Sequence, residues 1–247
     1  MPSHLPTGGT AERWRTEILS RLRSAGTEKE LFETLVIAAR ALGFDHCAYG
    51  LRIPTNLTSP RTLLFNTYPD AWRERYVSAD YIAIDPTVRH GTLSPAPLVW
   101  TDEVFRETPE FWEDARSHGL RHGWAQSSID RHGIRGMLTL SRSHESLLDA
   151  ELREKGYQMM WLTHAAHQRM SDLVVHRMLP EAHVVLTGKE KDILRWTAEG
   201  KTSGEISTIM GIKERTVNFH IANAIEKLSC ANKTAAVARA CLLGLLN

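Results

Sequence analysis

The sequence has few cysteines, and they do not stand at the spacings of structural sites. Its three cysteines, Cys47, Cys230 and Cys241, are odd in number, and no C-x-x-C pair occurs. This argues against a disulfide framework and against a zinc site, and favours buried, inert thiols. His164 and His167 would share a helix face, but no cysteine or acidic cluster stands beside them at ligand spacing. The sequence therefore predicts no metal and no cofactor.

Long apolar runs are also lacking. No stretch approaches the ~18 consecutive apolar residues of a membrane helix. Residues 1–10 have no apolar signal-peptide core. Apolar residues still make up 42% of the 247 residues, which is normal for a globular protein with hydrophobic cores. We therefore expect a soluble, cytoplasmic protein with no membrane partner.

Neither sign of charge is in excess over the whole chain, which has 30 Lys and Arg against 29 Asp and Glu. The distribution is uneven, however. Residues 186–247 hold nine basic and six acidic residues, a net charge of +3, and the remainder holds 21 basic and 23 acidic residues, a net charge of −2. This asymmetry mildly favours nucleic-acid contact for the C-terminal part.

Pro180 breaks a long helical pattern and marks a predicted boundary between two domains. Residues 1–175 carry mixed helical and strand patterns, and residues 186–247 are helical throughout. Residues 179–183 lack any strong period. The sequence therefore predicts two domains joined by a linker at 176–185.

The first part is predicted to be the α+β portion of the fold, an α-β-α sandwich with an antiparallel sheet. A three-to-four-residue apolar period indicates helices that start near Tyr68 and Pro109 or cover residues 11–22, 28–42 and 147–178. Apolar-polar alternation between turn residues indicates strands at 44–53, 62–66, 123–130 and 136–142, with an edge strand at 97–100. Residues 54–60 connect the first two strands.

The second part begins with two helix-start motifs. Thr187-x-x-Glu190 and Thr202-x-x-Glu205 match the capping box, in which the Thr hydroxyl and the Glu carboxylate satisfy reciprocal backbone amides. Gly211 allows the tight turn after the second helix. A third helix follows almost at once, and a fourth is expected over residues 232–246. These four helices predict an all-α helix-turn-helix domain.

The third helix has one apolar face and one face suited to DNA. The apolar face consists of Val217, Ile221, Ala224, Ile225 and Leu228. The remaining surface carries short donors, acceptors and apolar groups that suit the major groove, namely Arg215, Thr216, Asn218, Phe219 and Asn223. We expect double-stranded DNA as the partner; a small helical bundle that makes protein contacts alone is the alternative.

Residues near the helix ends are the natural phosphate contacts. They supply affinity without sequence choice. The predicted set is Lys201, Thr202, Lys213, Lys227 and Lys233. Taken singly, each of these lysines is more often an ordinary solvated side chain.

Two motifs span this domain: Leu186-Thr187-x-x-Glu190-x-x-x-Leu194-x-x-x-Ala198-x-Gly200-Lys201-Thr202-x-x-Glu205-Ile206 and Arg215-Thr216-Val217-Asn218-Phe219-His220. Together they resemble the DNA-binding domain of LuxR-type transcriptional regulators. The resemblance covers the domain end to end. One departure is Lys213, where many members have a serine that caps the recognition helix. Because this domain terminates several kinds of sensor, it leaves the input signal open.

The first part carries motifs of its own: Tyr68-Pro69-Asp70-Ala71-Trp72-Arg73-x-x-Tyr76, then Ile84-Asp85-Pro86-Thr87 and Val99-Trp100, with Gly119 and Gly123 further on. They are similar to the acyl-homoserine-lactone-binding domain of the quorum-sensing subgroup. The implied ligand, an N-acyl-homoserine lactone, is uncharged, so its pocket should be mostly apolar with a few placed polar groups.

The resemblance also implies individual roles. The indole of Trp72 donates to the lactone carbonyl, Asp85 accepts the amide N–H, and Trp100 encloses the lactone ring. Tyr68 and Thr139 donate to the acyl carbonyl, and Tyr76 lies on the same helix face as Trp72. The predicted set is completed by Arg73, Pro86 and Gly123, the last for close backbone contact. Each residue also has a plain structural interpretation: tryptophans often lie in cores, and Asp85-Pro86 suits a helix start.

The whole chain is thus similar to a quorum-sensing transcription factor. We expect signal binding to complete the first domain's core and to favour a homodimer, with residues 147–178 as the seam. Two-fold symmetry then implies a pseudo-palindromic promoter site. An activator would also contact RNA polymerase. The alternatives are a ligand-independent (solo) regulator and a lactone-processing enzyme fused to a DNA-binding domain; the sequence lacks the nucleophile, metal and paired-carboxylate motifs of such an enzyme.

Overall fold

The computed structural model describes residues 9–55 and 60–246. Residues 1–8, within the segment without a signal-peptide core, and residues 56–59 of the predicted 54–60 connection lie outside this range. The chain divides into two compact units. The first combines residues 1–52, 62–130 and 135–173, and the second combines residues 53–61, 131–134 and 174–247. Among the described helices, none is both long and apolar enough for a membrane span.

A five-stranded sheet forms the centre of the first unit, in the order β2-β1-β5-β4-β3. The pairs β1–β5, β4–β5 and β3–β4 are antiparallel. The strands are β1 (His46–Ile53), β2 (Arg61–Asn66), β3 (Leu98–Val99), β4 (His122–Ile129) and β5 (Arg135–Arg142). The predicted antiparallel α+β fold is therefore confirmed.

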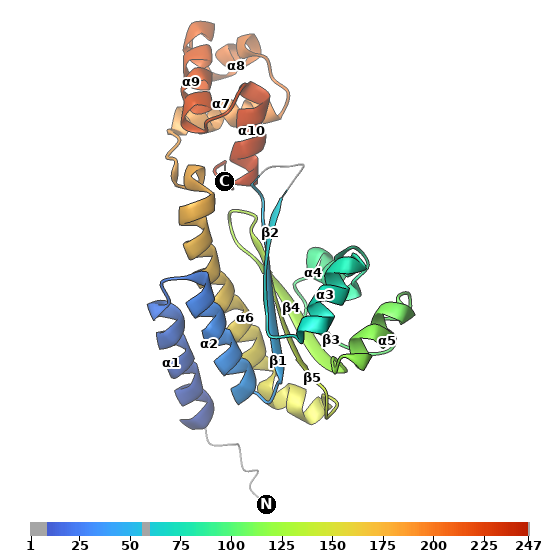
Figure 1. Cartoon of the computed structure of the whole chain (residues 1–247). Helices are drawn as coiled ribbons and strands as arrows, with labels where there is room; N and C mark the ends of the chain where they lie inside the picture. Colours follow the sequence, from blue (N-terminus) through green and yellow to red (C-terminus); the bar gives the residue numbers. More distant parts are fainter. Residues whose placement is uncertain (1–8, 56–59, 247) are drawn as a thin grey trace, which may run out of the picture. The chain divides into compact units, whose positions relative to one another are not determined.

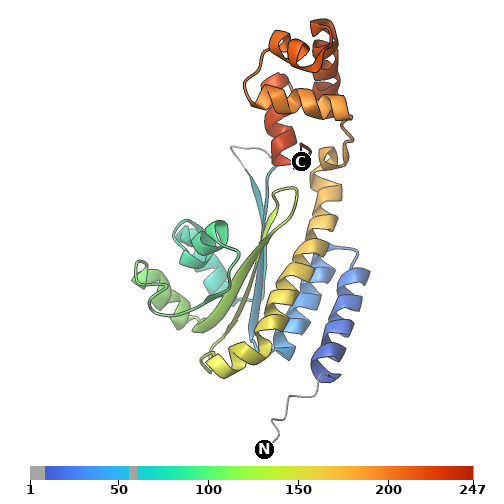
Figure 2. The ribbon, with the colours of Figure 1, turned by 180° about the vertical axis from the view of Figure 1, so that it is seen from behind.

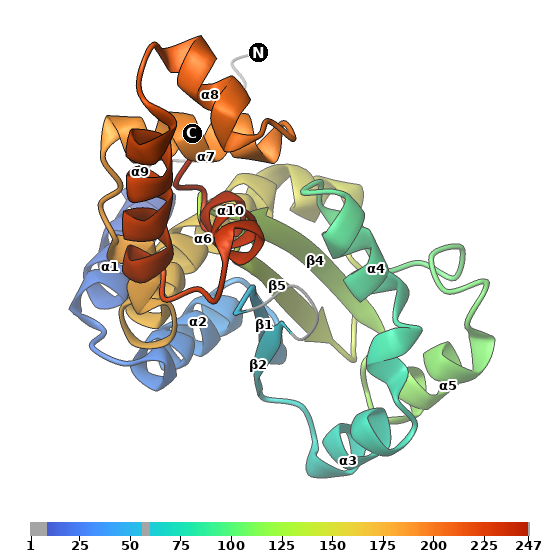
Figure 3. The same ribbon diagram turned by 90° about the horizontal axis from the view of Figure 1, so that it is seen from above.

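Helices cover both faces of this sheet (Figures 1 and 3). One face carries α1 (Gly9–Ser24), α2 (Glu28–Ala41) and α6 (Asp149–Met178), which lie side by side when the molecule is seen from behind (Figure 2). On the other face lie α3 (Asp70–Ser78), the short turn η1 (Tyr81–Ala83), α4 (Pro86–Leu93) and α5 (Pro109–Ser117). The sheet is thus the middle layer of the predicted sandwich.

The alternation of β1 decides which side chains meet which helices. Tyr49 is fully buried, and its hydroxyl lies 2.9 Å from Nδ1 of His167 on α6. Gly136 on β5 is required beside this pair, because a Cβ there would overlap both side chains. Positions 48 and 50, an alanine and a glycine, lie on the opposite face of β1, since successive residues of a strand alternate between its faces. That face lies under α3, α4 and α5.

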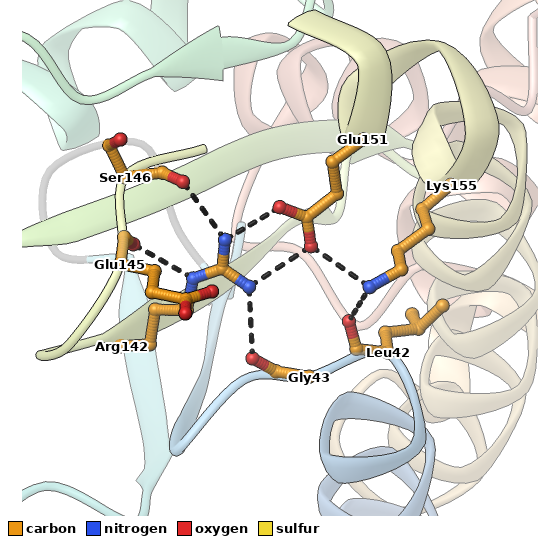
Figure 4. A network of polar contacts seen from close by, with 7 residues as sticks. All are labelled: Leu42, Gly43, Arg142, Glu145, Ser146, Glu151 and Lys155. Carbon is orange, nitrogen blue, oxygen red and sulfur yellow. Dashed lines mark hydrogen bonds and ion pairs between the residues drawn. The ribbon is translucent and has the colours of Figure 1, made fainter. Parts of the chain in front are cut away.

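A buried ion-pair network joins the end of β5 to α6 and α2 (Figure 4). Arg142 is 4% exposed, and its guanidinium donates to both oxygens of Glu151 at 2.6 and 3.0 Å. Lys155 donates to the same carboxylate and to the carbonyl of Leu42, each at 2.9 Å. Further acceptors of Arg142 are the carbonyls of Gly43, Glu145 and Ser146. Because removing one partner of a buried pair typically costs about 3–5 kcal/mol, this network fixes the base of α6 on the sheet.

The C-terminal helices of the second unit begin where local signals place them, but the fourth ends at Leu242, before the predicted residue 246. They are α7 (Gly188–Ala198), α8 (Ser203–Met210), α9 (Glu214–Lys227) and α10 (Lys233–Leu242). Both capping boxes are present, and Gly211 ends α8 with a φ of 63°. Before them, α6 continues to Met178 and a 3-10 turn, η2, spans Pro180–His183. The predicted linker therefore starts within the end of α6, and the domain limits stay a prediction.

Candidate functional site

A cavity of about 300 Å³ lies in the first unit between the sheet and the helices α3 and α5. Ala48 and Gly50 from β1 and Thr139 from β5 contribute to its floor. Its walls are mainly aromatic: Tyr68, Trp72, Tyr76, Trp100, Phe105, Phe111 and Trp112. An apolar enclosure with a few polar groups is the usual form of a site for a small uncharged molecule.

Asp85 is the buried charge at this cavity. It caps the N-terminus of α4: Oδ1 accepts from the backbone N–H of Thr87 at 2.8 Å and from its hydroxyl at 2.7 Å. Oδ2 accepts from the Tyr76 hydroxyl at 3.0 Å. Burial raises the pKa of Asp85, although these hydrogen bonds oppose the rise. The helix-start interpretation of Asp85-Pro86 is thus confirmed, and the same carboxylate lines the cavity.

Two tyrosine hydroxyls share this environment. Burial raises the pKa of Tyr76, and the charge of Asp85 raises it further. Burial likewise raises the pKa of Tyr68, again with a contribution from Asp85. Both phenols therefore stay protonated and serve as hydrogen-bond donors at physiological pH.

Trp72 and Trp100 have different neighbours: Trp72 packs among aromatic rings, and Trp100 packs on a glycine. Trp72 is 3% exposed, and its ring centroid lies within 6 Å of those of Tyr76, Tyr81 and Phe111. Trp100 lies directly on Gly123, where any Cβ would overlap the indole. The Trp100 indole N–H is buried and finds no acceptor within the described residues. It is therefore a donor that a bound molecule can satisfy.

Seven of the nine predicted ligand residues line the cavity: Tyr68, Trp72, Arg73, Tyr76, Asp85, Trp100 and Thr139. Pro86 is instead the first residue of α4, and Gly123 supports Trp100, as its predicted packing role requires. Arg73 is exposed and pairs with Asp70. Contact of any of these residues with a ligand stays a prediction.

Several cavity residues were missed by the sequence reasoning. Thr87 has a local signal, because an Asp N-cap brings the amide two residues later to its carboxylate. Phe111, Leu120 and Met137 also line the cavity but have no such signal. They come from α5, the segment after it and β5, so their meeting depends on the tertiary fold.

The second candidate site is the outer surface of α9. Val217, Ile221 and Ala224 are buried, as the apolar period predicts. Arg215, Asn218 and Phe219 are exposed, and the Phe219 side chain is 60% exposed. Thr216 and Asn223 are half-buried. A large exposed aromatic beside short polar groups is unusual for a solvated helix face and suits contact with a partner.

The start of α9 is held by α8. The Ser203 hydroxyl on α8 lies 2.8 Å from Oδ1 of Asn218 and donates to it. Lys213 is the N-cap of α9 and makes no side-chain capping bond. Amides at the start of a helix that lack a capping side chain suit an anion such as a DNA phosphate.

Lys227 differs from the other predicted phosphate contacts. Its ammonium donates to both oxygens of Glu190, at 2.8 and 3.0 Å, and Glu190 is 2% exposed. Burial raises the pKa of Glu190, but hydrogen bonds from Lys227 and Thr187 outweigh it and leave that pKa lowered. Lys227 therefore has a structural partner within the domain. Its DNA contact stays a prediction, as do those of Lys201, Thr202, Lys213 and Lys233, of which Thr202 and Lys213 are exposed and the others half-buried.

Two protein families match the chain. The autoinducer binding domain matches residues 27–170, and the family of bacterial regulatory proteins, luxR family, matches residues 184–240. The transcriptional activator protein AnoR of Acinetobacter nosocomialis is 46% identical over 95% of this chain and 100% of its own length. The HTH-type quorum-sensing regulator RhlR of Pseudomonas aeruginosa is 36% identical over 94% of this chain and 96% of its own.

A solved structure agrees over nearly the whole chain. SdiA, an Escherichia coli regulatory protein, in complex with octanoyl-rac-glycerol has a TM-score of 0.79 and 32% identity, and the match covers 99% of both chains. These relatives are named as a transcriptional activator, a quorum-sensing regulator and a regulatory protein, not as enzymes.

The ion pair of Lys227 with the buried Glu190 predicts a loss of stability that a lysine without such a partner does not share. Lys227→Ala leaves the Glu190 carboxylate buried without its cation, and we expect a loss of about 1–3 kcal/mol in the free energy of unfolding, measured by urea denaturation. Lys213→Ala is the matched control and should change that free energy by less than about 0.5 kcal/mol, as is usual for an exposed position. Equal stability of the two variants would contradict the structural role of Lys227.

Proposed function

Because the chain belongs to the LuxR family of quorum-sensing transcriptional regulators, we propose that its cavity binds an N-acyl-homoserine lactone and that this binding controls attachment to promoter DNA. The autoinducer-binding and helix-turn-helix domains supply the small-molecule input and the DNA output of the family. We assign residues 1–175 to signal binding and dimerisation, 176–185 to the linker and 186–247 to DNA binding.

The carboxylate of Asp85 carries this proposal. It lies buried in an aromatic cavity, where Oδ2 accepts from Tyr76 and keeps acceptor capacity for an amide N–H. An acyl-homoserine lactone has one amide, two carbonyl groups and an apolar tail. In our assignment the amide donates to Asp85, Trp72 donates to the lactone carbonyl, and Tyr68 and Thr139 donate to the acyl carbonyl. Trp100 encloses the lactone ring.

Ligand binding in this scheme is coupled to folding. The cavity leaves aromatic walls without partner atoms, so a molecule that fills it restores contacts that the empty core lacks. A ligand that binds the native state alone stabilises it by mass action. The signal then raises the population of folded, DNA-competent protein.

The output in this scheme is a dimer on a two-fold site. We place the dimer seam along α6, because Tyr157 on this helix is 82% exposed. Two recognition helices related by two-fold symmetry bind a pseudo-palindromic promoter site with half-sites about one helical turn apart. The name of AnoR, a transcriptional activator, supports activation by this chain as well. In our proposal such activation involves contact with RNA polymerase.

A second ligand class has support of its own. SdiA is solved with octanoyl-rac-glycerol, an uncharged molecule with a hydroxylated head, an ester and an acyl tail. The same acceptor at Asp85 and the same donors at Trp72 and Tyr68 suit such a head group. A monoacylglycerol is therefore the alternative ligand. If neither class binds, the chain is a ligand-independent regulator.

Asp85 gives the direct test of the ligand proposal. We expect an N-acyl-homoserine lactone to raise the melting temperature of the wild-type chain, and Asp85→Ala to abolish this rise because the amide N–H loses its acceptor. The matched control Asp172→Ala, at an exposed position of α6, should keep the full rise. The same melting measurements with octanoylglycerol in place of the lactone test the alternative ligand class. The lactone proposal is wrong if no lactone of any tail length changes the wild-type melting temperature.

The same measurement carries a pH dependence. In our assignment the ligand amide N–H donates its hydrogen bond to the charged form of Asp85, and burial raises the pKa of this group. Protonation therefore begins at a less acidic pH than for an exposed aspartate, and the ligand-induced rise in melting temperature should shrink as pH falls through the raised pKa. Asp85→Asn cannot titrate, so its response should show no such change over the same pH range.

Asn218 tests the output independently of the input. Asn218→Ala removes the amide that reads adenine, so we expect a loss of about 1–3 kcal/mol in binding to a site selected by the wild-type protein from random double-stranded DNA. The ligand-induced rise in melting temperature should stay intact, because Asn218 lies outside the cavity. Loss of both activities would point to misfolding of this variant.

Tyr157 tests the dimer seam. Replacing an exposed aromatic in a two-fold interface introduces the change twice, so Tyr157→Arg should shift the ligand-bound protein towards monomer in sedimentation velocity. Lys213→Ala, at an exposed position outside this helix, is the control and should leave the dimer in place. An unchanged dimer in the Tyr157 variant would place the seam elsewhere.

A further inference from the structure

Met137 lies between the cavity and helix α4. It stands on β5 opposite Gly50 of β1 and Ser127 of β4, and its side chain lines the cavity. On the other side it reaches Gly91 of α4, where a Cβ would lie 2.8 Å from the Met137 sulfur. Real Cβ contacts are longer than this, so the methionine occupies its present place only because residue 91 is a glycine.

The two ends of the cavity differ in chemistry. At one end Trp100 covers Gly123, which pairs with Ser141 of β5. Met137 lies four residues further along the same strand, a distance of about 13 Å at the usual rise of a strand. Gly50 pairs with Met137, and a Cβ on Gly50 would lie 3.3 Å from Leu64, so the lining beside Met137 includes apolar groups. Val88 of α4 is a further apolar residue of the lining.

We propose that Met137 sets the length of the acyl tail that the cavity accepts, and that Gly91 holds its side chain back from the cavity. The proposal rests on the function proposed above, because it requires a ligand with a polar head and an apolar tail. The head belongs at the end with Asp85, Trp72 and Trp100, and the tail therefore runs along β5 towards Met137. A flexible thioether suits such a stop, since it fills irregular gaps.

Gly91 and Met137 change the tail space in opposite directions. Met137→Ala removes three heavy atoms from the end of the cavity and makes room for about three methylenes. Gly91→Ala adds a Cβ 2.8 Å from the present position of the Met137 sulfur, which is too close, and so pushes the methionine into the cavity. The alanine also suits the interior of α4 better than glycine, so this variant should fold well.

The experiment compares the full chain and four variants against unsubstituted N-acyl-homoserine lactones from butanoyl to tetradecanoyl. The variants are Met137→Ala, Gly91→Ala, the double variant, and Met137→Leu as the volume-conserving control. Dissociation constants come from isothermal titration, and the rise in melting temperature is a second readout.

We expect Met137→Ala to move the optimal tail two to three methylenes longer, with affinity rising about fourfold for each methylene newly buried. Gly91→Ala should move the optimum shorter, and Met137→Leu should leave it in place. The double variant should match Met137→Ala alone, because the new Cβ then has no methionine to displace. A purely structural role of either residue would lower affinity for all tails alike.

Three results would overturn the proposal. The first is the same optimal tail in the wild type and in every variant. The second is a Gly91→Ala shift that persists when Met137 is already alanine. The third is equal binding of all tail lengths by the wild type, as expected if long tails leave the cavity past Leu64, which is 56% exposed. In all three cases lactones still bind, so lactone binding as the proposed function stands. If the wild type binds no lactone, both the proposed function and the tail-length role of Met137 are wrong.

Discussion

The carboxylate of Asp85 is a charge inside an aromatic enclosure, and the arrangement around it follows from the need to satisfy that charge. An isolated buried carboxylate is strongly unfavourable unless hydrogen bonds replace its water. Tyr76 from α3 and Thr87 from α4 supply those bonds, so the two helices are positioned relative to each other by one acceptor. Pro86 adds a preorganised first turn. The same need explains why a ligand with an amide donor, as we propose, belongs at this end of the cavity.

The core of the first unit contains a cavity beside that acceptor. Trp72, Tyr81 and Phe111 contact one another through their ring edges and faces, which makes a stiff wall, while Ala48 and Gly50 keep the floor of the sheet low. An unfilled space in a core forfeits dispersion contacts that its lining atoms would otherwise make. Stability and occupancy of the cavity are therefore linked physically, and this link is how a small molecule can act on a regulator of transcription.

In the helix-turn-helix domain the outer face of α9 is separate from the contacts that hold the domain together. Its core is carried by the buried face of α9 and by α7 and α10, and the Glu190–Lys227 ion pair fastens the start of α7 to the end of α9. Because this face bears the stabilising contacts, the opposite face of α9 need not contribute to stability. Arg215, Asn218 and Phe219 can therefore be chosen for a partner, which is the condition for sequence readout.

The sequence by itself determined the local structure: the two capping boxes, the helix start at Asp85-Pro86, the strand alternation and the turn at Gly211 all depend on residues within one or two turns of each other. Seven of the nine residues that the motif resemblance singled out line one cavity in the structure. Only the tertiary structure decided that Met137 lies against Gly91, that Phe111 and Leu120 complete the wall, and that Lys227 pairs with Glu190, 37 residues away. These contacts follow from the strand order β2-β1-β5-β4-β3 and from helix docking. Local hydrogen bonds and periodicity are written in neighbouring residues, whereas contacts between distant segments depend on how whole faces fit together.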